Sequence, residues 1–213
     1  MLDQYARRAP KHIWLRTELI DLFREYAEGL AARDRTDAAE KVFRQALAVA
    51  EPLLAEKDAT FPCFSKGLVK QFDPLARSLA TKPSVLPGDL ALAVRMAEWA
   101  VEREPANGAF RQTLGLCRYR IGDWASAVVD LEESMKLSQG GEVADWLLMA
   151  LTRAHRGETR DARMWHRRAL GRIRSEGCQD GSGVEVARLL EEANALFPAE
   201  GPEEGRNGVV DPW

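Results

Sequence analysis

Apolar residues recur every three or four positions along most of the chain, which is the spacing of one face of an α-helix. The pattern is regular in residues 15–30, 38–49 and 90–101. In the first stretch it places these residues on one face: Leu15, Leu19, Ile20, Leu22, Phe23, Tyr26 and Leu30. Alternation of apolar and polar residues, the pattern of a half-buried strand, is nearly absent. The chain is therefore predicted to be all-α.

Short polar stretches divide the apolar pattern into pairs of helices. Turn-forming residues lie at Gly122-Asp123 and Gly157-Glu158, and Asp34 occupies the matching place in an earlier pair. The segments 108–140 and 143–170 are similar to one another at an offset of 35 residues, which superposes the two glycine turns. An internal repeat of this length predicts stacked helix pairs, because one pair alone cannot bury its apolar face.

Small residues recur at fixed places in the two similar segments. Gly115 aligns with Ala150 in the first helix, and Ala127 aligns with Ala162 in the second. Small side chains at these places are predicted to let two antiparallel helices approach closely, while larger neighbours fill the space to the next pair.

These residues resemble the tetratricopeptide repeat (TPR) family, whose period is about 34 residues. The resemblance is carried by Leu114, Gly115, Tyr119, Ala127, Leu131 and Ser134 in one pair, and by Trp146, Ala162, His166 and Ala169 in the next. Tyr119 lies one position later than the tyrosine of the family. The resemblance implies a TPR-like α-solenoid of about four stacked antiparallel helix pairs, with a C-terminal capping helix at residues 184–197.

The expected domain organisation follows from this repeat region. Residues 1–16 form an N-terminal lead-in, residues 17–197 form the helical repeat domain, and residues 198–213 form a disordered acidic tail. The composition supports the tail, because residues 177–213 hold 2 basic and 8 acidic side chains and the last part is rich in Pro and Gly. For residues 52–67, one more helical turn and an ordered loop both remain open.

The repeat segment also resembles those of planctomycete-type bacterial signalling proteins, in which such arrays are often attached to serine/threonine kinase domains. The chain carries no kinase Gly-rich loop, HRD or DFG motif. The resemblance therefore leaves two alternatives, a free-standing relative and the repeat part of a larger protein.

Composition and charge narrow the function classes. A net charge of -3 argues against a protein whose main role is to bind nucleic acid through its phosphates. No apolar run is long enough to span a membrane, and no secretory signal is recognisable. Cys63, Cys117 and Cys178 are far apart and odd in number, which favours a reducing compartment. A cytoplasmic protein without membrane contact is expected, and its end helices offer a route to homo-oligomers.

No constellation of catalytic or metal-binding residues stands out. The histidines form no HExxH motif and the cysteines form no CxxC motif, so neither a metal nor a cofactor is expected. His166 is interpreted as a packing residue and Cys117 as a small core residue. Arg160, Arg163, Arg167 and Arg174 lie at helical spacing, which fits a solvated outer face better than a surface for RNA or a phosphorylated partner. An enzyme with its own active site is not expected.

The working surface implied by the resemblance is the concave groove lined by the first helix of each pair. The residues assigned to it are Gln112, Leu116, Tyr119, Arg120, Leu147, Leu151, His155 and Arg77. They make an apolar strip with a charged edge, which suits a protein or peptide segment with apolar anchors. The alternative is that the capping helix or the tail covers the strip. The expected function is a non-enzymatic scaffold that binds a protein segment in this groove. The alternatives are a regulatory repeat module associated with a kinase-type signalling protein and a nucleic-acid adaptor.

Overall fold

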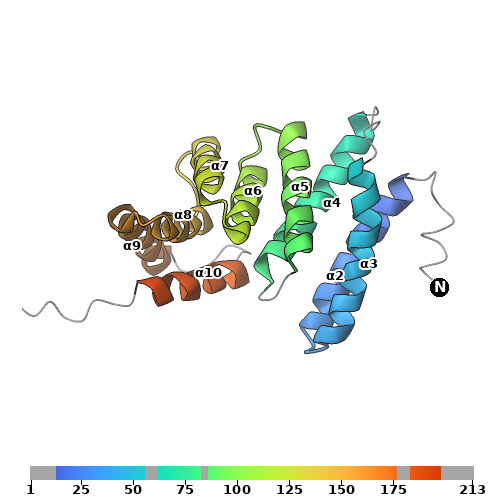
Figure 1. Cartoon of the computed structure of the whole chain (residues 1–213), viewed down its shortest axis with the longest axis horizontal. Coiled ribbons are helices and arrows are strands. Elements are labelled where there is room, and N and C mark those ends of the chain that lie inside the picture. The colour runs from blue at the N-terminus through green and yellow to red at the C-terminus, as the bar shows by residue number, and fades with distance from the viewer. Residues whose placement is uncertain (1–12, 56–61, 83–85, 177–182, 198–213) are drawn as a thin grey trace, which may run out of the picture. The chain divides into compact units, whose positions relative to one another are not determined.

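The structure is a computed structural model that describes residues 13–55, 62–82, 86–176 and 183–197, and all regular secondary structure within them is helical (Figure 1). This confirms the predicted all-α class. The helices are α2 (Ile13–Ala31), α3 (Thr36–Ala55), α4 (Pro62–Thr81), α5 (Pro87–Arg103), α6 (Gly108–Ile121), α7 (Trp124–Leu137), α8 (Val143–His155), α9 (Thr159–Glu176) and α10 (Gly183–Leu196).

The chain divides into two compact units, one up to Gly141 and the other from Glu142 onward. In unit 1, α2 packs with α3, α4 with α5, and α6 with α7. The first helices of these pairs contact one another in chain order, α2 with α4 and α4 with α6. In unit 2, α8 pairs with α9 and also packs against α10. Packing of adjacent helices in pairs agrees with the division that the sequence predicts.

The turns inside three pairs use the same left-handed backbone conformation. Gly122 has φ 84° and Gly157 has φ 80°, a region that glycine enters without steric cost. Asp34 takes the same role in the α2–α3 turn with φ 58°, and Asp is among the few residues with a side chain that tolerate this region. The departure from glycine at Asp34 therefore leaves the turn geometry unchanged.

Polar side chains fix the starts of the helices in the second half of unit 1. Asn107 accepts a hydrogen bond from the backbone N–H of Ala109 at 3.1 Å, at the start of α6. Asp123 accepts one from the backbone N–H of Ser126 at 3.2 Å, at the start of α7. Hydrogen bonding from Ser126 also lowers the pKa of Asp123. These caps satisfy N–H groups that the helix itself leaves unpaired.

The small residues of the repeat lie where helices approach closely. Gly115 of α6 faces Leu131 of α7, and a Cβ placed on Gly115 would lie 2.9 Å from both Cγ and Cδ2 of Leu131. In unit 2, Ala150 of α8 and Ala162 of α9 are fully buried. The structure thus supports the close-packing role that the sequence predicts for the small residue at position 115.

The structure answers part of the question left open for residues 52–67. Helix α3 continues through Pro52 to Ala55, and α4 begins at Pro62, where a missing N–H costs nothing. Residues 56–61 lie outside the described part of the chain. At the N-terminus α2 begins at Ile13, so the last residues of the expected lead-in belong to a helix. The expected disordered tail, 198–213, also lies outside the described residues.

Candidate functional site

Unit 1 contains five of the residues assigned to the groove, on α4 and α6. Leu116 is fully buried, and Gln112 and Tyr119 are also buried. Arg77 and Arg120 are partly exposed. A fully buried leucine cannot serve as a surface anchor, so Leu116 is a core residue in this structure. The part of the assignment that remains accessible is the pair of arginines.

Both arginines connect the first helices of neighbouring pairs. Arg77 Nη2 on α4 donates hydrogen bonds to Gln112 Oε1 at 3.0 Å and to Thr113 Oγ1 at 2.9 Å, both on α6. Arg120 Nε on α6 donates to the carbonyl oxygen of Ala80 on α4 at 2.9 Å. Each guanidinium group therefore holds α4 against α6 while part of it stays at the surface. Hydrogen bonds of charged donors are stronger than those of neutral ones, so these contacts fix the relative position of the two helices.

Helix α2 carries an acidic cluster. Arg24 Nη1 contacts Glu28 Oε2 at 3.0 Å, and Arg24 Nη2 contacts Asp21 Oδ1 at 2.5 Å. The side chains of Asp21 and Glu28 are each at least about one third exposed, whereas that of Arg24 is only 15% exposed. Arg24 Nη2 also lies 3.7 Å from Glu25 Oε1, so one arginine charge is shared among three carboxylates and this part of α2 has a net negative charge.

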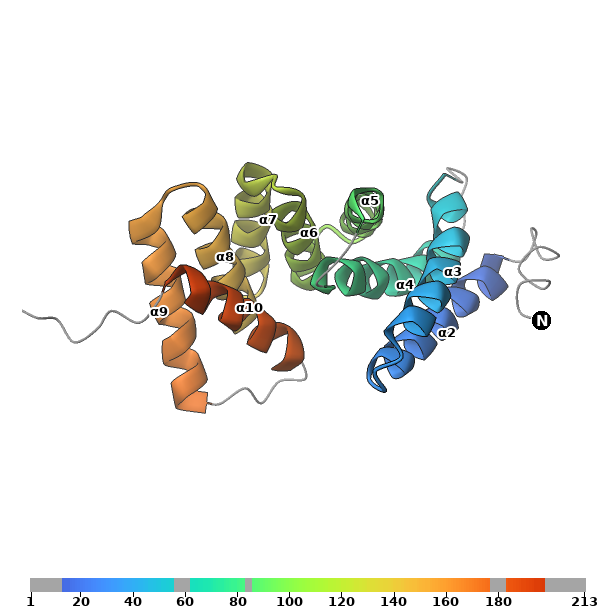
Figure 2. The same cartoon turned by 60° about the horizontal axis from the view of Figure 1, so that its bottom comes forward.

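Unit 2 contains the other assigned residues, Leu147, Leu151 and His155, all on α8. His155 is exposed, but Leu147 and Leu151 are fully buried. Helix α10 packs against α8, as Figure 2 shows within unit 2, and it contributes buried apolar residues of its own, Val186, Leu189 and Ala193. The placement of these two leucines on an open apolar strip is therefore corrected: they are core residues of a unit whose third helix covers α8.

The end of α10 is held against α9 by one buried histidine. His166 Nε2 lies 3.1 Å from Asn194 Oδ1, and its ring stacks on Phe197 with centroids 5.2 Å apart. Burial lowers the pKa of His166, and the contact with Asn194 opposes that shift. This geometry agrees with the interpretation of His166 as a packing residue.

A buried ion cluster joins α5, α6 and α7, and the sequence analysis did not find it. Asp130 is 1% exposed, and its two oxygens contact Arg111 Nη1 at 3.1 Å and Arg118 Nη1 at 2.6 Å. Arg118 Nη2 also contacts Glu98 Oε1 at 3.0 Å. Burial raises the pKa of Asp130, and the two guanidinium groups oppose the rise. The carboxylate is inaccessible to a substrate, so the cluster is a structural brace.

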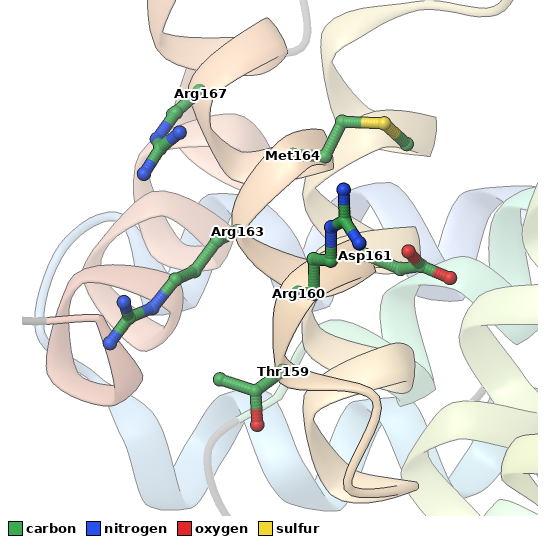
Figure 3. Close-up of a pocket in the computed structure, with 6 residues that line it drawn as sticks. All are labelled: Thr159, Arg160, Asp161, Arg163, Met164 and Arg167. Carbon is green, nitrogen blue, oxygen red and sulfur yellow. The ribbon is translucent and has the colours of Figure 1, made fainter.

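The outer face of α9 forms an open hollow of about 640 Å³ (Figure 3). Its lining residues all come from the first three turns of the helix: Thr159, Arg160, Asp161, Arg163, Met164 and Arg167. Figure 3 shows Arg163 and Arg167 projecting to one side of the helix and Met164 and Asp161 to the other, with Arg160 between them. Three arginines and one carboxylate give the hollow a positive charge.

Reactive and metal-binding groups are few in the described part of the chain. Cys117 is a fully buried free thiol whose Sγ lies 3.8 Å from the carbonyl oxygen of Ala76, as expected of a small core residue. Among the described residues, no group of three or more His, Cys, Asp or Glu could hold a metal ion. None of the helices within the described ranges is long and apolar enough to cross a membrane.

The chain matches no protein-family model and no curated protein sequence. Its function is therefore inferred from its own geometry. The relevant features are the polar surface on the first helices of unit 1, the covering of α8 by α10, and the arginine-lined hollow on α9.

Proposed function

We propose that this chain is a non-enzymatic helical-repeat scaffold of the TPR type, which binds a segment of another protein along the first helices of its pairs. The observation that carries the proposal is the packing of α10 on α8. There an amphipathic helix of the chain itself lies against the first helix of a pair and buries Val186, Leu189 and Ala193. This contact within the chain is the model for the proposed one, in which a partner segment lies along the first helix of a pair.

In unit 1 the corresponding helices carry charged side chains at their surface, and α2 also exposes Leu22 and Tyr26. We define the first-helix surface by seven of the exposed and partly exposed polar residues of α2, α4 and α6: Asp21, Arg24, Glu28, Lys70, Asp73, Arg77 and Arg120. Its α2 end is acidic, and its α4 end carries Lys70 and Arg77, which lie seven positions apart and so share a helix face. A segment with charges of both signs in the complementary order fits this surface.

A peptide-display selection on the immobilised full chain tests the proposal. The selection is repeated on Lys70→Glu/Arg77→Gln, which alters the first-helix surface. A matched control, Lys41→Glu/Arg95→Gln, makes the same change in charge at exposed positions of the second helices α3 and α5. Circular dichroism and thermal melting of each variant establish that it is folded, because Arg77 also braces α4 against α6.

The expected result is a shared motif among peptides enriched on the parent chain, with binding lost on the first-helix variant and kept on the control. Equal enrichment on the parent and the folded first-helix variant would place binding elsewhere and contradict the proposal. So would a selection in which no peptide is enriched on any of the three proteins.

A further inference from the structure

The arginines of α9 do not form a uniform solvated face. Arg168 lies over the ring of Trp146 at 4.4 Å from guanidinium carbon to centroid, and over that of Trp165 at 5.3 Å. Its charge is therefore engaged by two aromatic faces of unit 2. Arg160, Arg163 and Arg167 line the hollow on the outer face of the same helix (Figure 3).

The hollow combines positive charge with an exposed apolar side chain. Met164 is 54% exposed, although it lies within one helical turn of all three arginines. Methionine has a flexible, polarizable side chain that adapts to different apolar partners. Gly171 lies one turn beyond Arg167 on the same face, and a Cβ there would meet nothing within 4 Å, so the face stays open beyond the hollow.

We propose that this hollow, the α9 hollow, binds an acidic segment of another protein in which an apolar residue is flanked by carboxylates. The apolar residue packs on Met164, and the carboxylates pair with Arg160, Arg163 and Arg167. Arg160 and Arg167 are separated by about 10 Å along the helix axis, a span that acidic residues of a short peptide match. The planar guanidinium group suits carboxylates because it donates two parallel hydrogen bonds to them. This site is separate from the first-helix surface, so it goes beyond the proposed function.

The charge of the molecule favours an acidic protein segment over a nucleic acid. The net charge is -3, and Asp161 itself lines the hollow. A nucleic acid carries a continuous row of phosphates, which extends well past the three arginines of the hollow. A short acidic protein segment can place its carboxylates opposite the three arginines without carrying further negative charge beyond the hollow. Its apolar residue also uses Met164, which offers nothing to a phosphate backbone.

The test uses the full chain and a fluorescein-labelled acidic peptide with one leucine flanked on each side by glutamates, followed by fluorescence anisotropy. The hollow variant is Arg160→Gln/Arg163→Gln/Arg167→Gln. Its matched control is Lys41→Gln/Arg95→Gln/Lys136→Gln, which removes the same charge from exposed positions of unit 1. Met164→Ser probes the apolar contact separately. Two further probes are a peptide with glutamines in place of the glutamates and a single-stranded RNA of equal charge.

The expected result is binding of the acidic peptide that is at least about tenfold weaker for the hollow variant and nearly unchanged for the control. Met164→Ser is expected to weaken it by about threefold to tenfold. The peptide with glutamines should bind poorly, and added salt should weaken binding of the acidic peptide. Equal weakening in the control variant, tighter binding of the RNA, or no binding of the acidic peptide would each overturn the proposal. The Lys70→Glu/Arg77→Gln variant should bind this peptide normally, which separates this outcome from the test of the first-helix surface.

Discussion

The contact between Gly115 and Leu131 makes a strong prediction about stability. Gly115→Ala adds one Cβ to α6 at a point where it lies 2.9 Å from Cγ and Cδ2 of Leu131. Carbon atoms in ordinary contact lie about 3.5–4.0 Å apart. Leu131 is fully buried on α7, so it has no solvent-filled space into which to move. Either its side chain leaves its preferred rotamer or α6 and α7 move apart.

The expected loss of stability is the difference between two opposing effects. Replacing glycine by alanine inside a helix stabilises it by about 0.5–1 kcal/mol. Inserting an extra carbon into a well-packed core costs about 1–3 kcal/mol. The two ranges leave a net loss of up to about 2.5 kcal/mol, and their midpoints predict that Gly115→Ala lowers the free energy of unfolding by about 1 kcal/mol. Gly171→Ala on α9 is the matched control: a Cβ there has nothing within 4 Å, so the helix effect alone should raise stability.

Urea unfolding of the parent and both variants, followed by circular dichroism at the helix band, measures these changes. The two substitutions should change the free energy of unfolding in opposite directions: Gly115→Ala should lower it and Gly171→Ala should raise it. A second test combines Gly115→Ala with Leu131→Ala, which removes the side chain that the new Cβ meets. The double variant should be more stable than the sum of the single effects predicts. A Gly115→Ala variant as stable as the parent would refute the view that close approach of α6 and α7 requires glycine here.

Three further predictions concern charge and capping. Asp130→Ala should lower the free energy of unfolding by about 3 kcal/mol in urea unfolding, because it leaves two arginines, 26% and 23% exposed, without the carboxylate between them. Because the pKa of His166 is lower in the folded chain than its unfolded value of about 6.5, its contribution to stability is complete above pH about 6.5 and is lost as pH falls from there through the folded pKa. Urea midpoints between pH 7 and 5 should therefore fall more for the parent than for His166→Gln. Asn107→Ala should lower the melting temperature, through a loss of about 1 kcal/mol, because the cap of α6 is removed; an unchanged melting temperature would show that the start of α6 does not depend on this cap.

Local patterns were sufficient to predict the helices and the turns within pairs. The period of the apolar residues identifies each helix, and Gly122 and Gly157 mark turns because their backbone is left-handed. The ends of α3 and α4 were harder to predict. The sequence leaves a helical turn and an ordered loop both open for residues 52–67, and α3 in fact continues through Pro52 to Ala55. A proline in an outer turn removes one hydrogen bond, and tertiary packing can offset that loss.

The ion cluster around Asp130 was missed because its members are distant in sequence and individually ordinary. Arg111 and Arg118 are seven positions apart on α6, so they share a face, and this spacing is the one signal that the sequence offers. Their common partner lies on the next helix, and Glu98 lies on the preceding one. Whether an arginine points to solvent or to a buried carboxylate depends on the helix that packs opposite, which periodicity does not specify.

The same reason explains why Leu147 and Leu151 were placed on an open strip. Their spacing predicts an apolar face on α8, and that face exists, but periodicity is identical for a face that binds a partner and for one that packs inside its own unit. Here α10 packs on the α8 face, so the two leucines belong to the core of unit 2. A protein partner that used the α8 face would have to displace α10 and expose two buried leucines. The first-helix surface of unit 1 and the α9 hollow require no such displacement, because Lys70 and the lining arginines Arg160 and Arg167 are already exposed. Binding at these two surfaces should therefore leave α10 protected from hydrogen exchange, whereas binding on α8 would remove that protection.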